Sequence, residues 1–175
     1  EAHPILRGLV STYLSVLSGE GTAISLSRPK VDIGRFDSTE ILLTASGGLP
    51  TDLRLGFEPP THHVALLRAP RLVVTYFEGP ATPQQDIGWV GTFVASDSER
   101  AERALAQSEP PSHDAWVFAN LPTGEAKRIV KKLMTTLREA LVSRYRPAPG
   151  PSAVQIPLVR VAGALGSILA MSGHS

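Results

Sequence analysis

Apolar residues recur at intervals of three or four positions in the first twenty residues, which is the spacing of one helix face. Pro4 suits the first turn of such a helix, and Gly19 and Gly21 follow its end. We predict an amphipathic helix here, and Gly8 makes it dependent on packing. The apolar stripe expected to face the domain consists of Ile5, Leu6, Leu9, Val10, Tyr13, Leu14 and Leu17.

Two further helices are predicted in the second half of the chain. The pattern from Ser96 to Glu99 is a capping box, so a helix is expected from there to about Gln107. Another helix is expected after Thr123, because apolar residues again follow one stripe. That stripe consists of Ile129, Val130, Leu133, Met134, Leu137 and Leu141.

Between residues 22 and 95 the periodicity shifts towards two, the repeat of a β-strand. The alternation is clearest from Asp52 to Glu58, and the stretch from Thr61 to Arg68 fits a strand better than a short helix. The other predicted strands are Ala23–Ser27, Val31–Arg35, Glu40–Ala45, Leu72–Glu78 and Ile87–Ala95.

These elements predict an α+β fold. We expect an N-terminal helix, a mainly antiparallel sheet of about five to seven strands, arranged as a meander or small barrel, and two C-terminal helices packed on it. The chain has 175 residues, of which 42% are hydrophobic and 19% charged, values typical of one globular domain. The domain is expected to span residues 3–145.

The C-terminal end differs in composition from the rest. Residues 146–151 hold three prolines and a glycine, which indicates a semi-rigid connector. Residues 152–175 form an apolar tail, predicted to be a docking helix, although Pro157 restricts where that helix begins. Because the chain starts at Glu1 and not at a methionine, we expect it to be part of a longer protein.

Charge and cysteine content narrow the function classes. Seventeen basic and sixteen acidic residues leave a formal charge of +1, so any electrostatic function must be local. The absence of cysteine excludes disulfides and thiolate chemistry and favours the cytoplasm. No apolar stretch is long enough to span a bilayer, so a soluble domain without membrane insertion is expected.

One short sequence occurs twice. Residues 58–62 read Glu-Pro-Pro-Thr-His, and residues 109–113 read Glu-Pro-Pro-Ser-His. If the two copies converged, His62 and His113 would be candidate metal ligands, or members of an acid–base pair. His63, Glu58, Glu109 and Asp114 would be available beside them. The favoured interpretation is structural, because a Pro-Pro stop followed by a hydroxyl is also a simple way to end one element and start another.

The last predicted helix has a cationic side. Seven basic residues against two acidic ones lie between Asn120 and Gly150, so a nucleic-acid-binding face on the helix 127–146 is one hypothesis. A solvated surface helix that pairs with the acidic residues of the preceding helix is the favoured interpretation. The candidate partner- or phosphate-binding residues are Lys127, Arg128, Lys131, Lys132 and Arg138.

About a quarter of the chain resembles a known family. The order of a Leu-Leu-Arg-Ala-Pro-Arg segment at 66–71, strands at 72–77 and 89–95, and a helix from Ser96 is similar to the split-barrel flavin-binding family related to pyridoxamine phosphate oxidase. The resemblance implies a flavin cofactor, with Arg68, Arg71 or Thr75 near its phosphate.

Common nucleotide-binding and hydrolase motifs are missing from the sequence. We therefore favour a non-catalytic interaction module that binds a protein partner or another domain of its parent chain. No cofactor is predicted on this interpretation; nucleic acid, flavin and a divalent metal stay as alternatives, and a homo-oligomer is left open.

Overall fold

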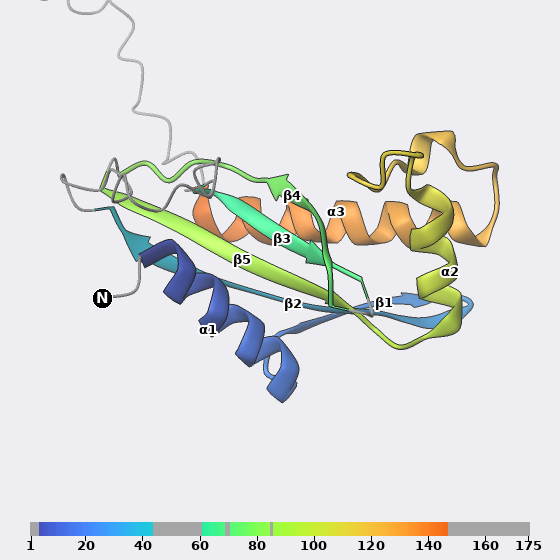
Figure 1. Ribbon diagram of the computed structural model, residues 1–175, viewed down its shortest axis with the longest axis horizontal. Coiled ribbons are helices and arrows are strands. Elements are labelled where there is room, and N and C mark those ends of the chain that lie inside the picture. Colours follow the sequence, from blue (N-terminus) through green and yellow to red (C-terminus); the bar gives the residue numbers. More distant parts are fainter. Residues whose placement is uncertain (1–3, 44–60, 69–70, 85, 147–175) are drawn as a thin grey trace, which may run out of the picture.

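The computed structural model describes residues 4–43, 61–68, 71–84 and 86–146 (Figure 1). It confirms the α+β prediction of an N-terminal helix, a mostly antiparallel sheet and two C-terminal helices. The helices are α1 (Pro4–Ser18), α2 (Glu99–Ser108), the short 3-10 helix η1 (Phe118–Asn120) and α3 (Glu125–Tyr145). The strands are β1 (Thr22–Ser27), β2 (Lys30–Leu42), β3 (His63–Leu67), β4 (Val73–Glu78) and β5 (Ile87–Ala95).

The five strands form one open sheet in the order β1-β2-β5-β3-β4. Neighbours are antiparallel except β3 and β5, which run parallel. The connectivity is therefore neither a meander nor a barrel, because β5 lies between β2 and β3. The composition of β5 suits a central position: its nine residues include no charged side chain, and almost all are buried.

Most strands match their predicted ranges. β5 has the predicted bounds, β3 confirms a strand between residues 61 and 68, and β4 differs by one residue. The predicted strands Val31–Arg35 and Glu40–Ala45 belong to one long strand, β2, which pairs with β5 from Gly34 to Leu42. The predicted strand at 52–58, and the connector and tail from residue 147 onwards, lie outside the described residues.

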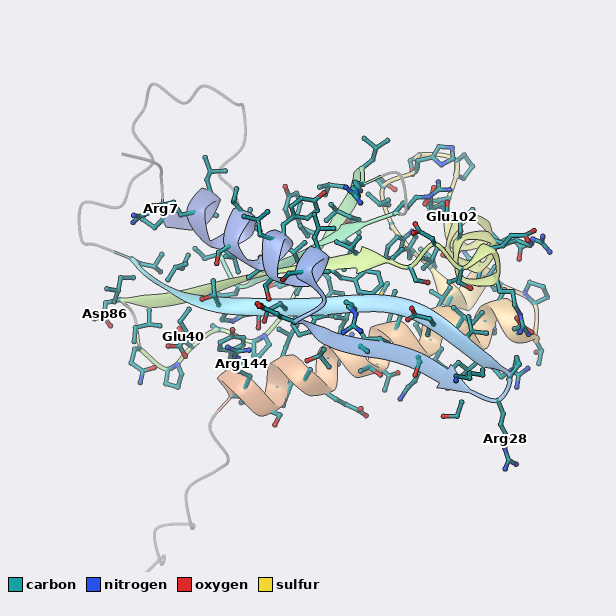
Figure 2. All side chains as sticks on the ribbon, turned by 90° about the horizontal axis from the view of Figure 1, so that it is seen from below. Arg7, Arg28, Glu40, Asp86, Glu102 and Arg144 are labelled. Carbon is teal, nitrogen blue, oxygen red and sulfur yellow. The ribbon has the colours of Figure 1, made fainter. Side chains whose placement is uncertain are left out.

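The larger core lies between the sheet and the α2–α3 layer (Figure 2). Every residue of the predicted α3 stripe is fully buried except Met134, which is partly buried. Trp89 of β5 stacks on Tyr145 of α3, with ring centroids 4.7 Å apart, and this burial raises the pKa of Tyr145. The Tyr145 hydroxyl donates a hydrogen bond of 2.9 Å to Ser38 of β2, which ties the end of α3 to the sheet.

The smaller core lies on the opposite face, under α1. Ile5 packs there with Ile41 of β2 and Val90 of β5. Close approach depends on Gly8, since a Cβ at this position would lie 2.6 Å from a methyl group of Val90. The domain therefore has three layers, with α1 on one face of the sheet and α2 and α3 on the other (Figures 1 and 2).

Two details of α2 differ from the sequence prediction. The helix begins at Glu99 with Ser98 as its N-cap residue, and the Ser96 hydroxyl accepts from the Ser98 amide at 3.3 Å and donates to the Asp32 carbonyl at 2.7 Å. The packing of α2 against α3 also places Arg100 of α2 beside Glu125 of α3, at 2.7 Å. This ion pair is the reverse of the expected contact between acidic α2 and basic α3.

Among the described residues, no helix is long and apolar enough to cross a membrane.

Candidate functional site

The side of α1 that faces away from the sheet is unusually apolar. We name this surface the apolar flank and define it as Leu6, Val10, Leu14 and Leu17. Val10 and Leu14 are each 57% exposed, and Leu17 is 42% exposed. Leu6, Val10 and Leu14 also line a surface hollow together with Arg7 and Ser11.

The predicted stripe of α1 was therefore only partly correct. Ile5 does face the sheet, but the other fully buried positions of the helix are Gly8, Thr12 and Val16. The Thr12 hydroxyl lies 2.8 Å from the hydroxyl of Thr92 on β5, and it also donates to the Gly8 carbonyl. Small and hydroxyl-bearing residues thus make the contact with the sheet, which turns most of the large apolar side chains outward.

The charge of α1 accentuates this exposure. Arg7 is the single charged residue among the fifteen residues of the helix. A surface helix usually presents charged and polar residues opposite its buried stripe. The sequence contained this signal, since the apolar residues of α1 cover a wider arc than one buried face requires.

The face of the sheet beside the apolar flank is also partly apolar. The contact with Thr12 places Thr92 on the α1 side, and the strand register aligns Ala65 and then Tyr76 with Thr92. Paired residues on neighbouring strands point to the same face. In the described residues no helix crosses this part of the sheet, because α1 packs mainly on β2 and β5 (Figure 1). At the start of β4, Val73 is 47% exposed on this face.

The predicted basic residues do lie on α3, but three of them have partners within the domain. Lys127 donates to the Leu121 carbonyl at 3.0 Å, and Arg128 donates to the Arg28 carbonyl at 3.3 Å. The guanidinium of Arg138 lies 5.9 Å from the centre of the Phe77 ring. The remaining two residues, Lys131 and Lys132, are exposed.

The two Glu-Pro-Pro-Thr/Ser-His segments share a backbone conformation at their histidines. His62 and His113 have φ angles of 65° and 54°, in the left-handed region where histidine is enriched among non-glycine residues. In the second copy, the amide of His113 donates to the carbonyl of Pro110 at 2.9 Å and closes a turn. This geometry accounts for the second copy as a local turn, whereas in the first copy the His62 amide donates to the Trp89 carbonyl at 2.7 Å.

The two copies are positioned at opposite ends of β3. His62 immediately precedes the strand, whereas Arg68, which follows it, forms an ion pair with Glu109 of the second copy. Since a strand rises about 3.3 Å per residue, the copies are about 20 Å apart along it. Within the described ranges, no group of three or more His, Cys, Asp or Glu residues has a geometry that would hold a metal.

His62 lies against the aromatic core. Its ring meets Trp89 edge to face at a centroid distance of 6.0 Å, and its Nε2 atom is buried without a hydrogen-bond partner. Burial lowers the pKa of His62, because the charged imidazolium would lose its hydration there; the Ile87 backbone partly offsets this effect. Burial therefore favours the neutral form of His62.

Glu109 is the centre of a polar network between β3 and the loop after α2. Its carboxylate, whose side chain is only 2% exposed, accepts from Arg68 at 3.1 Å, from Trp116 at 3.1 Å and contacts Nδ1 of His113 at 2.9 Å. Arg68 also binds Glu102, and this hydrogen bond is the main reason why the pKa of Arg68 is raised. The other three members of the network, Glu102, His113 and Trp116, lie on α2 and the loop after it, so the network ties the end of β3 to that part of the domain.

The residues assigned to a flavin phosphate by family resemblance lie near this network. Arg68 is already neutralised by two carboxylates, so its charge is not available to a phosphate. The Arg71 side chain is exposed and lines a surface hollow with Arg35 and Ser96, and Thr75 pairs with Leu66 within the sheet. The open sheet also differs from the barrel that the resemblance implies.

The structure thus places the predicted basic residues together on α3 and keeps His62 and His113 apart. The apolar flank, which was not predicted as a site, is exposed in the described part of the domain.

Comparison of the chain with protein-family models, with curated proteins and with solved structures found no match.

Proposed function

We propose that this domain is a non-catalytic interaction module, and that its apolar flank binds an apolar helix presented by a protein partner or by another part of the parent chain. The proposal rests on one observation. The outward side of α1 carries Leu6, Val10, Leu14 and Leu17, and the whole helix has a single charged residue. Apolar residues at such spacing, when exposed, are the usual complement of an amphipathic helix in a groove.

The energetics support a binding role for this flank. Each of the four side chains leaves a third to a half or more of its surface in water. Burying the remainder would stabilise a complex by about 1 kcal/mol per side chain, from the apolar area removed from water. A contact of this size needs no charged partner, since Arg7 is the only charge on the helix.

The basic side of α3 offers a second hypothesis, nucleic-acid binding, with less support. Lys127, Arg128 and Arg138 already contact carbonyl groups or an aromatic ring of the domain. Lys131 and Lys132 are exposed and would be the phosphate contacts to test.

The experiment compares two surfaces of the same full chain. One variant carries Val10→Glu with Leu14→Glu, and its matched control carries Lys131→Glu with Lys132→Glu on the opposite helix layer. Each is immobilised beside the unmodified chain, and captured proteins are quantified by mass spectrometry. A protein that is lost only from the α1 variant is then purified, and its binding to all three chains is measured by calorimetry.

We expect the α1 substitutions to weaken binding of the purified partner at least tenfold, because two carboxylates would be desolvated in an apolar contact. The α3 control should bind within twofold of the unmodified chain. Equal binding by the α1 variant would overturn the proposal. Salt-sensitive binding of a duplex oligonucleotide that is lost only from the α3 variant would favour the nucleic-acid hypothesis.

A further inference from the structure

The apolar flank has a candidate occupant within the chain itself. Twenty-nine residues follow Arg146, all outside the described residues. The last twenty-four, residues 152–175, contain Arg160 and His174 but no acidic residue. From residue 158 onwards, large apolar residues recur at the three- and four-residue spacing of a helix face, at Leu158, Val161, Leu165 and Ile168.

The geometry of the described residues brings the start of this segment near α1. Arg144, close to the end of α3, and Arg7, close to the start of α1, lie toward the same end of the sheet on opposite faces (Figure 2). The two helices are separated by the sheet, which corresponds to two packed layers of about 10 Å each. Residues 147–157, which precede the first residue of that helical spacing, would span up to about 37 Å if extended, which is enough to pass around that end.

The apolar flank and the C-terminal segment are also chemically compatible. The apolar flank and the segment from Leu158 to Ile168 are both nearly uncharged, with one arginine each, Arg7 and Arg160. Contact between them buries no carboxylate and leaves both arginines able to extend into water along their aliphatic stems. An apolar segment of this length would otherwise remain exposed beside an apolar helix.

We propose that residues 158–175, which follow Pro157, dock as a helix on the apolar flank of their own chain and cover it until a partner displaces them. The inference rests on the proposed function in that both use the same surface, and it adds an intramolecular competitor. A short connector holds the segment at an effective concentration in the millimolar range, so even a weak contact keeps the flank largely covered. To displace the tethered segment, a partner must therefore bind the apolar flank more tightly than that segment does.

The absence of cysteine in the chain allows a direct test. Leu14→Cys on the apolar flank is combined, in the full chain, with Leu158→Cys, Val161→Cys, Leu165→Cys or Ile168→Cys in turn. The matched control replaces Leu14→Cys by Lys131→Cys, an exposed position on α3 across the sheet. Disulfide formation under mild oxidation is followed over time by non-reducing electrophoresis and intact mass.

At least one Leu14 pair is expected to form an intramolecular disulfide ten or more times faster than its Lys131 counterpart, because docking fixes the distance between the sulfurs. Adding Val10→Glu and Leu17→Glu should reduce that rate to the control level. Equal rates for both series would overturn the inference, as would a disulfide-linked dimer, which would assign the segment to a second copy. Neither result depends on an external partner, so the proposed function stands or falls separately.

A second measurement does not use cysteine. Trypsin cleavage after Arg160 should be at least fivefold faster in the Val10→Glu, Leu14→Glu variant than in the unmodified chain, because the docked segment is protected. The Lys131→Glu, Lys132→Glu control should be cleaved there at the unmodified rate. Identical rates in all three chains would contradict docking.

Discussion

The two long helices of this domain cover opposite faces of one sheet, yet they are built differently. α3 has eight charged residues among twenty-one, and its buried stripe consists of large apolar side chains that are fully excluded from water. α1 has one charged residue among fifteen, and its buried positions include Gly8 and Thr12. The large apolar side chains of α1 are instead divided between the sheet and the outside.

This difference separates two uses of an apolar helix. In α3 the hydrophobic residues of the stripe are buried in the core, and the outer side is an ordinary solvated surface. In α1 the small residues allow close contact with the sheet, and the larger ones remain available for another surface. The comparison therefore distinguishes a helix whose large apolar residues are buried in the core from one that leaves several of them exposed.

The largest expected effect is a loss of stability when the buried faces of α3 and α1 are altered. Leu137→Ala in α3 should reduce the free energy of unfolding by about 3 kcal/mol, because a fully buried leucine leaves a cavity. Val16→Ala at the α1–sheet contact should cost about half as much, since it removes only two methyl groups. Urea denaturation followed by circular dichroism measures both. Equal losses would break the comparison by showing that α1 is anchored as deeply as α3.

The next effect concerns the polar network on the α2–α3 side. Glu109→Gln should destabilise the domain by about 2 kcal/mol, because Arg68 loses a buried carboxylate partner. Glu102→Gln is the matched control, and it should cost less because that side chain is 28% exposed. The same denaturation experiment applies. A larger loss for Glu102→Gln than for Glu109→Gln would contradict the central role of Glu109.

A smaller effect is expected where α1 approaches the sheet. Gly8→Ala adds a methyl group 2.6 Å from Val90, for which we expect about 2 kcal/mol of overpacking. Alanine recovers about 1 kcal/mol of helix propensity, so the net loss should be about 1 kcal/mol. Ser11→Ala, at an exposed position of the same helix, is the control and should not destabilise the domain. A stabilising Gly8→Ala would show that the approach is looser than the structure indicates.

The smallest effect is a pH dependence from His62. Because burial lowers its pKa in the folded protein from the usual 6.5, the unfolded chain binds the proton more readily. The free energy of unfolding should thus rise as the pH increases towards 6.5, level off above it, and fall below it. His62→Asn, which tolerates the positive φ of this position, should remove that contribution. Identical pH profiles of the two chains would count against a buried neutral imidazole.

Helices and strands were predicted correctly from the sequence where the apolar residues of a segment fit a single pattern of burial. α3 repeats apolar residues on a single narrow stripe, and β5 is apolar on both faces with glycine and polar residues at its ends, so their positions followed from periodicity. The α1 stripe was wider than one face, so several orientations satisfied the same pattern. Ser96 satisfied a capping pattern as well, but the tertiary fold offered its hydroxyl the Asp32 carbonyl.

The candidate surfaces divide in the same way. The sequence located the basic residues of α3 and the repeated Glu-Pro-Pro segments, but it did not determine which of these residues already have partners. Only the tertiary structure placed His62 and Glu109 at opposite ends of β3 and turned the apolar flank outward. Local periodicity determines where a helix or strand forms, because it depends on neighbours along the chain. Which face is buried depends on surfaces that come from distant residues, here Thr92 and Val90 of β5, and these meet α1 only after the chain has folded.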